Sequence, residues 1–332
     1  MSAINYYKLP LEDKLTIIND LADTLKRPAY AIEKDWWVVQ TLRLLMQMEV
    51  SKHMIFKGGT SLSKAWHLID RFSEDIDLAI DREFLGFSGK ISRTQVGKLR
   101  DASYTYLSET FFPALKSEFA SAGITDVQIN IINVQTPDQD PLQIEIVYTP
   151  VVKYTTYVSP RVILEIGSRS MMEPNTLCSF SSMIGENYPD LPFADTAIHV
   201  PTANPERTYL DKLFLLHEEF QRTDTRVDRL SRHLYDIEKI ARTPYAKAAI
   251  ADKELYHAIV AHRELFNRFA GVDYKTHFPP TLNPVPPANL LSDWEKDYIR
   301  MQQEMIYGES LSFSELLKRI KDITVQINQQ KI

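Results

Sequence analysis

The sequence predicts a mixed α/β (α+β) lobe over residues 1–200 and an all-helical lobe over residues 201–332. Short apolar runs of strand length alternate with helical segments as far as residue 166, a pattern typical of a mixed sheet covered by helices. Three prolines, Pro192, Pro201 and Pro205, then mark a connector. Beyond the connector, apolar residues recur only at helical spacing, so we expect no strands there.

The composition narrows the class of protein. The 332 residues are 44% hydrophobic and 25% charged, which excludes a disordered chain and suits two packed domains. A net charge of −6 argues against a general coating on nucleic acid and leaves a local basic groove possible. The single cysteine, Cys178, excludes an intramolecular disulfide framework and a cysteine-rich zinc site.

The expected location is cytoplasmic. One cysteine fits a reducing compartment. No apolar run reaches the roughly 18–20 residues of a membrane span, and Met1–Tyr7 does not resemble a secretory signal. We therefore expect no membrane partner.

The first elements of the N-terminal lobe follow from apolar spacing. Apolar residues three or four positions apart predict a helix from Leu11 that ends before Pro28, and a second helix over 31–48. The apolar run 53–56 has the length of a strand and stops at two glycines. A helix should follow, capped by Thr60 or Ser61 and with an apolar side that extends to Ile69.

In the rest of this lobe, strand-like and helical segments again follow one another. Residues 75–80 alternate between polar and apolar, as a half-buried strand does. Residues 94–122 have helical spacing, and strand-like runs follow at 127–134, 142–148 and 162–166.

The second lobe is predicted to be helical throughout. Residues 279–287 form a proline-rich loop within it. The expected helices span 205–220, 226–241, 245–269, 292–307 and 312–327.

The strongest chemical signal is the segment Phe56-Lys57-Gly58-Gly59-Thr60-Ser61-Leu62. A strand enters two glycines and a helix starts at once, so backbone N–H groups can approach an anion closely. The spacing of a Walker loop is absent. The candidate phosphate ligands are Lys57, Gly58, Gly59, Thr60, Ser61 and Lys64.

A pair of carboxylates follows in Glu74-Asp75-Ile76-Asp77-Leu78. Asp75 and Asp77 lie two positions apart on the predicted strand, so both project from one face. Adjacent carboxylates repel each other unless a cation neutralises them. We therefore expect Mg²⁺, or alternatively Mn²⁺, bridging nucleotide phosphates at Asp75 and Asp77. A bare Gly-Gly turn or a bare Asp-x-Asp is usually structural, and only their conjunction favours a site.

Two glutamates compete for the place of a third metal ligand. Glu145 and Glu165 each lie on the polar side of a predicted strand. Both could reach the face that carries Asp75 and Asp77, and strand periodicity alone does not choose between them.

Basic residues supply further candidates. Lys212 lies away from the apolar stripe of its helix, so it is free to face a cleft or bulk water. On the next predicted helix, Arg229, Arg232, His233 and Asp236 share one side, with Arg226 upstream. This side is either a basic wall for nucleotide or RNA phosphates or an exposed face with i,i+4 ion pairs such as Arg232–Asp236.

These segments resemble a known family. The order strand, Gly-Gly-Thr-Ser, helix, Asp-x-Asp is typical of polymerase-β-like nucleotidyltransferases. The segments Lys57–Lys64 and Arg71–Leu78 resemble the AbiEii-type nucleotidyltransferase toxin family. Three further motifs agree, from about residue 30 to 240: Glu33-Lys-Asp-Trp-Trp37, Tyr209-Leu-Asp-Lys-Leu213 and Arg232-His-Leu-Tyr-Asp236.

The resemblance implies an activity. A polymerase-β-like lobe would bind an NTP, and Lys212 would contact its triphosphate. Asp236 would orient the acceptor, assist its deprotonation or hold Lys212. The resemblance favours Glu165 as third metal ligand. Separately, a helix held beside the glycine turn would place Lys34 near a phosphate. The site would be a cleft between lobes, with Asp75 and Asp77 on one wall and Lys212 and Asp236 on the other.

The implied protein is the toxin of a bacterial toxin–antitoxin or phage-defence system, with a separately encoded antitoxin. It would transfer NMP to RNA, with the 3′ end of tRNA as acceptor. Two alternatives remain: a nucleotidyltransferase that modifies a protein hydroxyl, which the acidic composition favours mildly, and a catalytically silent nucleotide-binding partner protein.

Overall fold

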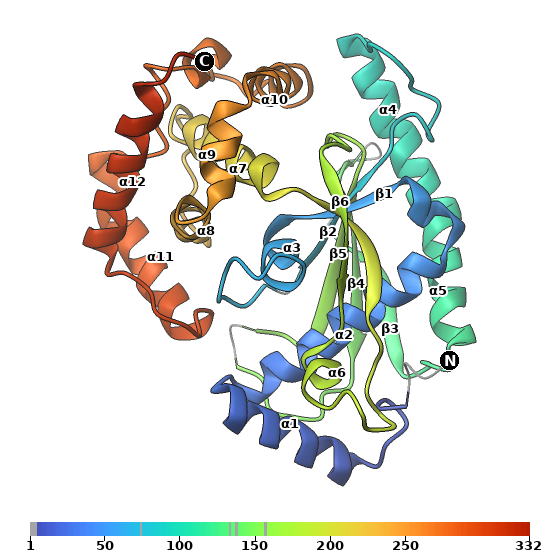
Figure 1. The fold of residues 1–332 in the computed structure, drawn as a ribbon. Helices are drawn as coiled ribbons and strands as arrows, with labels where there is room; N and C mark the ends of the chain where they lie inside the picture. Colours follow the sequence, from blue (N-terminus) through green and yellow to red (C-terminus); the bar gives the residue numbers. More distant parts are fainter. Residues whose placement is uncertain (1–4, 74, 133, 137–138, 156–157) are drawn as a thin grey trace. The chain divides into compact units, whose positions relative to one another are not determined.

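The computed structural model describes residues 5–73, 75–132, 134–136, 139–155 and 158–332, and it divides the chain into two compact units (Figure 1). The first unit is Met1–Ala65 with Phe72–Thr202, and the second is Trp66–Arg71 with Ala203–Ile332. Sequence analysis assigned Trp66–Arg71 to the first lobe, yet these six residues belong to the helical unit.

The first unit is built on a seven-stranded mixed sheet of order β3-β4-β5-β2-β1-β7-β6. β2 is antiparallel to β1 and parallel to β5, and β5 is antiparallel to β4. This mixed sheet, with helices around it, confirms the predicted α/β class. The strands are β1 (Met54–Lys57), β2 (Asp75–Ile80), β3 (Val127–Ile132), β4 (Leu142–Tyr148), β5 (Arg161–Gly167), β6 (Asn175–Phe180) and β7 (Ile198–Ala203).

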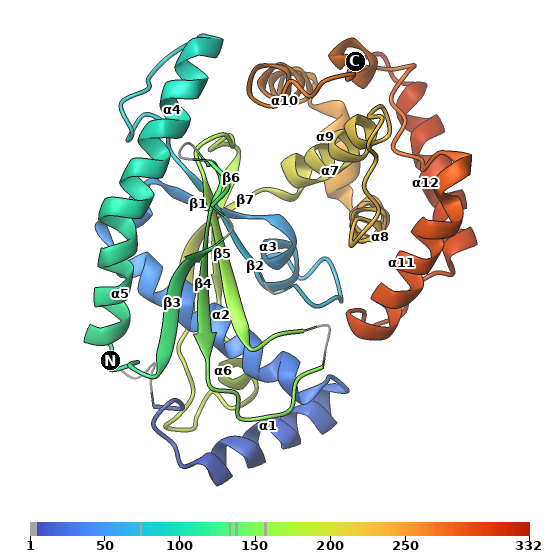
Figure 2. The ribbon, with the colours of Figure 1, turned by 180° about the vertical axis from the view of Figure 1, so that it is seen from behind.

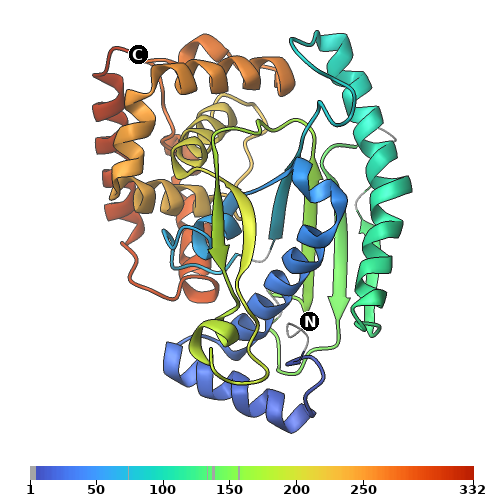
Figure 3. The ribbon, with the colours of Figure 1, turned by 45° about the vertical axis from the view of Figure 1, so that its right-hand side comes forward.

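The helices cover the sheet unequally. α4 and α5 lie on one side of it and the short α3 lies on the other (Figures 1 and 2), while α2 runs across the strands (Figure 3). The helical elements of this unit are α1 (Leu11–Leu25), α2 (Ala29–Gln47), η1 (Glu49–His53), α3 (Gly58–Lys64), α4 (Arg93–Tyr106), the π-helical turn η2 (Leu107–Phe111), α5 (Phe112–Ser121) and α6 (Met183–Asn187).

The core lies between the sheet and the larger helices. Ile76, Leu78 and Leu164 are fully buried there, together with α2, whose Trp37 stacks on Tyr148 with ring centroids 4.6 Å apart. The sheet therefore turns its apolar face toward α2 and α5, and its polar face is left for chemistry.

Two predictions about the first unit need correction. α3 begins at Gly58 and ends at Lys64, so Thr60 and Ser61 lie in its first turn and do not cap it, and Ile69 lies beyond it. β6 and β7 were missed, because β6 is mostly exposed and has little apolar alternation, and β7 contains Pro201, which was assigned to a connector. Glu74, which belongs to the segment Glu74–Leu78, and Asn133, which belongs to the predicted strand 127–134, lie outside the described residues.

The second unit is helical, as expected. Its core packs α8 against α7 and against α11 and α12, with Leu213, Leu234, Ile237 and Trp294 fully buried. The helices are α7 (Pro205–Glu219), α8 (Ser231–Ala241), α9 (Pro244–Ala251), α10 (Lys253–Phe266), η3 (Tyr274–His277), η4 (Ala288–Leu290), α11 (Leu291–Glu304) and α12 (Phe313–Asn328).

Two helix boundaries in this unit differ from prediction. The helix expected over 226–241 begins at Ser231, because the Asp297 carboxylate accepts hydrogen bonds from the N–H groups of Arg229 (2.7 Å) and Ser231 (3.0 Å). The helix expected over 245–269 is two helices, and Asp252 caps the second by accepting from the Leu255 N–H at 2.9 Å. Among the described residues, no helix is long and apolar enough to cross a membrane.

Candidate active site

Asp75 and Asp77 lie on one face of β2, as the alternation predicted. Both are partly exposed, whereas Ile76 and Leu78 between and after them are fully buried on the opposite face. Asp77 lies directly across from Lys57 in the antiparallel β1–β2 pair. The acidic pair and the glycine turn are therefore fixed to each other by the sheet.

Gly58 is required by this arrangement. Its φ is +80°, in the left-handed region, and a Cβ placed there would lie 2.0 Å from the Asp77 Oδ2. A side chain would thus carry both backbone strain and a clash with the carboxylate. The turn brings backbone directly against one of the two aspartates.

The hydroxyl groups of the turn point inward. The Thr60 hydroxyl contacts the Ser73 Oγ (2.9 Å) and the Asp75 carbonyl oxygen, and the Ser61 hydroxyl donates to the Gly58 carbonyl at 2.9 Å. Both side chains are buried. The Thr60 hydroxyl holds the turn against β2 and the Ser61 hydroxyl bonds within α3, so the groups best placed to meet a phosphate are the backbone N–H groups at the start of α3.

Glu165 and Glu145 are distinguished by register. Glu165 lies directly beside Asp77 in the parallel β2–β5 pair, whereas Glu145 lies one strand farther away, across from Ile163. Glu145 also pairs with Arg161 at 2.9 Å, and Glu165 accepts from the Gln143 amide. Position therefore favours Glu165 as the third carboxylate of this face.

The donor set fits a hard divalent cation. Asp75, Asp77 and Glu165 offer only carboxylate oxygens, the ligands that Mg²⁺ prefers. No group of three such side chains in the described part of the chain is arranged to hold a metal by itself. Mg²⁺ is usually bound by one or two carboxylates together with substrate phosphates, so a two-carboxylate site is the expected form.

The Glu33–Trp37 segment of α2 has an internal structural role. The Asp35 carboxylate accepts from the Met183 N–H (2.6 Å) and pairs with Lys64 Nζ (2.9 Å), and Lys64 also contacts Glu186 at 3.5 Å. The Lys64 ammonium group is thus engaged inside the protein. Lys34 is fully buried and lies over the Phe72 ring, 5.6 Å from its centroid.

Lys212 and Asp236 meet in the second unit. Lys212 Nζ lies 2.8 Å from Asp236 Oδ2, and Arg71 grips the same carboxylate with Nε and Nη2, each at 2.7 Å. Lys212 is only 6% exposed, so it is not a solvated surface lysine. Burial alone would raise the pKa of Asp236, but the charges of Arg71 and Lys212 outweigh it and hold that pKa below its ordinary value.

His233 completes this cluster. Burial and the charges of Lys212 and Arg232 lower the pKa of His233 well below its ordinary value, so the ring is neutral. Its Nδ1 lies 3.4 Å from Lys212 Nζ. An ammonium group can only donate, so the ring can pair with Lys212 only in the tautomer whose Nδ1 is unprotonated.

The arginines do not form the predicted helical wall. Arg226 and Arg229 precede α8, and Arg229 has φ +58°, so only Arg232 of the three lies on the helix. Arg226 pairs with the Glu219 carboxylate at 2.7 Å. The suggested Arg232–Asp236 pair is replaced by the contacts of Asp236 with Arg71 and Lys212.

Arg71 had no role in the sequence analysis. Arg71 is the first residue of the segment Arg71–Leu78, which resembles the family, and this position was the only feature of the sequence that could have suggested a role for it. Its partner lies 165 residues away, and no local pattern could indicate that pairing.

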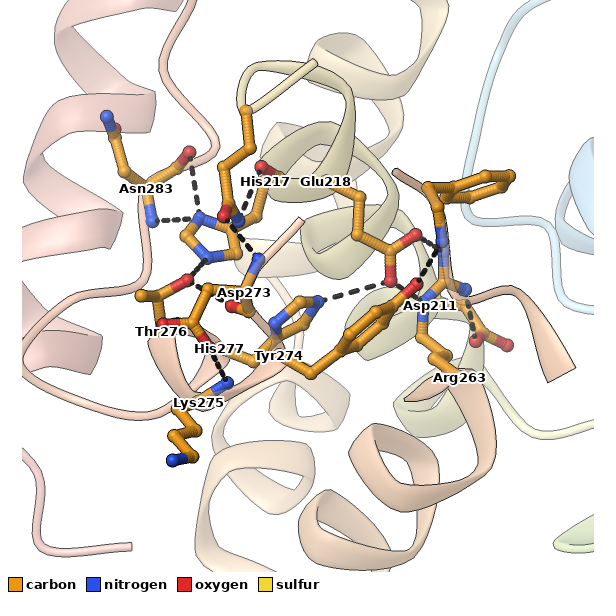
Figure 4. Close-up of polar contacts among 12 residues, drawn as sticks. Asp211, His217, Glu218, Arg263, Asp273, Tyr274, Lys275, Thr276, His277 and Asn283 are labelled. Atoms are coloured by element: carbon orange, nitrogen blue, oxygen red, sulfur yellow. Dashed lines mark hydrogen bonds and ion pairs between the residues drawn. The ribbon is translucent and has the colours of Figure 1, made fainter. Parts of the chain in front are cut away.

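A second polar cluster in this unit also went unnoticed (Figure 4). Arg263 binds both oxygens of Glu218 at 2.7 Å, and His277 Nε2 lies 3.1 Å from Glu218 Oε1. Next to it, His217 accepts from the Asn283 N–H at 2.9 Å. The cluster ties α7 to α10 and to the loop around η3.

The chain is similar to known nucleotidyltransferase toxins in sequence and in fold. The family model described as "Nucleotidyl transferase AbiEii toxin, Type IV TA system" matches residues 41–319, which is more than half of the chain. Among solved structures, the chain is similar in fold to MenT4, a nucleotidyltransferase toxin from Mycobacterium tuberculosis H37Rv. The TM-score is 0.58 at 17% identity, over 95% of this chain and 90% of that one. No curated protein sequence matches the chain. The chain therefore belongs to the AbiEii family of nucleotidyltransferase toxins of type IV toxin–antitoxin systems.

Proposed function

We propose that the protein transfers a nucleoside monophosphate from an NTP to RNA, with a hydroxyl at the 3′ end of tRNA as the acceptor. The observation that carries the proposal is the contact of Gly58 with Asp77. That contact supports the proposal, because it brings the backbone at the start of α3 against Asp77, and Asp75 lies on the same face of β2; such an arrangement would suit a triphosphate and its cation.

Each residue then has a chemical task. Backbone N–H groups at Gly59 and Thr60 would bind the triphosphate. Asp75 and Asp77 would hold Mg²⁺ or Mn²⁺, which when bound lowers the pKa of the acceptor hydroxyl and neutralises the leaving pyrophosphate. Glu165, which lies next to Asp77 on the neighbouring strand, is the proposed further ligand. The acceptor hydroxyl would release its proton to solvent as its oxygen attacks the α-phosphorus in line, and the bond to pyrophosphate would break.

Lys212 would stabilise negative charge on the phosphates. We assign Asp236 the task of holding Lys212, because both of its oxygens are occupied by cations.

In the cell, the proposed activity would be that of the toxin, with phage defence as its setting and a separately encoded antitoxin restraining it. Expression without an antitoxin should arrest bacterial growth, and the Asp75→Ala form should not. Equal growth at matched protein levels would remove the growth-arrest proposal and leave the chemistry open.

The decisive experiment incubates the purified protein with each labelled NTP, Mg²⁺, and either total RNA or protein from a cell lysate. Label on tRNA that is absent with Asp75→Ala is the expected result. Label on protein instead would favour the protein-modifying alternative, which the net charge of −6 fits. Bound nucleotide without any transfer would favour a silent nucleotide-binding protein.

A further inference from the structure

We propose that Arg71 is a positioning residue for the transfer reaction, which fixes Asp236 and through it the ammonium group of Lys212. The inference rests on the proposed function. It gives a role to Arg71, a residue to which the motif resemblance assigned none.

The contact geometry is specific. Arg71 approaches Asp236 with Nε on Oδ1 and Nη2 on Oδ2, both at 2.7 Å, which is the bidentate fork of a guanidinium on a carboxylate. Lys212 Nζ takes Oδ2 at 2.8 Å. With both oxygens held by the fork, the Asp236 carboxylate cannot rotate, so the direction of Lys212 is set by Arg71.

Arg71 is itself held in place by the second unit. The preceding Asp70 carbonyl accepts from the Tyr307 N–H at 3.0 Å, and Arg71 forms an isolated antiparallel bridge with Ile306. Nearby, the Trp66 indole donates to the Ala203 carbonyl at 3.0 Å. The guanidinium is therefore attached to a fixed backbone and can act as a rigid support.

The charge balance suits an anionic ligand. Two buried cations, Arg71 and Lys212, face one carboxylate, Asp236. Arg232 adds positive charge, and neutral His233 faces Lys212 from α8. A phosphate oxygen bound by Lys212 would therefore lie close to several positive charges.

A purely structural role is the rival, and the same unit contains a matched pair that tests it. Arg263 grips Glu218 with the same two bonds, each at 2.7 Å. It lies outside the motifs itself and also contacts Asp211, at 3.3 Å. If bidentate pairs of this kind serve only stability, loss of either arginine should have the same consequences.

The experiment compares Arg71→Met, Arg71→Lys and Arg263→Met in the full-length protein. One readout is kcat/KM for transfer from a labelled NTP, normalised to the folded fraction. The other is the titration of Lys212, followed by NMR of ¹³Cε-labelled lysine and assigned with Lys212→Arg. The second readout does not depend on activity.

We expect Arg71→Met to lower kcat/KM by about ten- to a hundredfold and to raise the pKa of Lys212, because a neighbouring positive charge is removed. Arg71→Lys should restore the pKa of Lys212 but only part of kcat/KM, since a lysine keeps the positive charge and cannot form the bidentate contact with Asp236. Arg263→Met should lower the melting temperature and change neither readout.

Two results would contradict the role of Arg71, and a third would contradict the proposed function instead. Wild-type kcat/KM and an unchanged Lys212 titration in Arg71→Met would overturn the role of Arg71 and leave the proposed function intact. An equal loss in Arg263→Met would show a structural role only. If the wild type transfers no nucleotide, the proposed function fails, and the Lys212 titration alone decides whether Arg71 controls Lys212.

Discussion

Replacing Gly58 by alanine should damage both folding and transfer, by amounts that follow from its surroundings. The residue has φ +80°, and an added Cβ would lie 2.0 Å from Asp77 Oδ2, whereas real Cβ atoms keep at least 3.0 Å. The carboxylate or the turn must therefore move by 1 Å or more. The left-handed backbone costs an alanine about 1–2 kcal/mol, and the forced displacement about 1–3 kcal/mol more.

Gly123 provides the control, because its φ is +78° and an added Cβ would meet no atom within 4 Å. Gly123→Ala should lose about 1–2 kcal/mol in urea denaturation and keep full activity. Gly58→Ala should lose more, and displacement of Asp77 by about 1 Å should reduce transfer on the order of a hundredfold. If the two variants are equally stable and equally active, the assigned contact between the turn and Asp77 is wrong.

Three further changes test other parts of the structure. Asp77→Ala should abolish transfer in Mg²⁺ without lowering the melting temperature, because it removes a charge from a polar strand face; wild-type turnover would contradict the metal role. Lys64→Met should cost about 3–5 kcal/mol in urea denaturation, because it leaves buried Asp35 without its cation; unchanged stability with weaker NTP binding would instead make Lys64 a phosphate ligand. Burial first, and then His277, lower the pKa of His217 from 6.5 to about 4. Between pH 6.5 and 4, His217 is therefore protonated in the unfolded chain but stays neutral in the folded chain. Stability is full above pH 6.5 and falls by up to roughly 3 kcal/mol as the pH drops to 4; the loss should be smaller in His217→Gln, and an equal slope in both proteins would refute this assignment.

The parts of the fold that local pattern decides were predictable. Alternation over 75–80 determines which face of β2 carries Asp75 and Asp77, because side chains on a strand alternate strictly. The glycine turn was equally readable, since only glycine accepts its backbone geometry without strain.

The parts that distant partners decide were not predictable. Lys64 was expected to bind phosphate, and its ammonium group is instead engaged by Asp35, which lies on another helix. α8 starts five residues later than its charge pattern suggests, because Asp297, far along the chain, caps it. Helical spacing reports which residues share a side, and it carries no information about which carboxylate a buried cation will find.

The assignment of Trp66–Arg71 to the helical unit has a consequence for how this protein can be dissected or recombined. The polypeptide passes from one unit to the other at 65/66, at 71/72 and at 202/203, so no single cut releases a complete helical unit. A fragment that starts at Ala203 would contain Lys212 and Asp236 but not the guanidinium that pairs with them. For the same reason, a chimera that joins the front of one family member to the back of another at residue 203 would combine an arginine and an aspartate from different parents. Such exchanges should succeed only where residues 66–71 travel with the C-terminal portion.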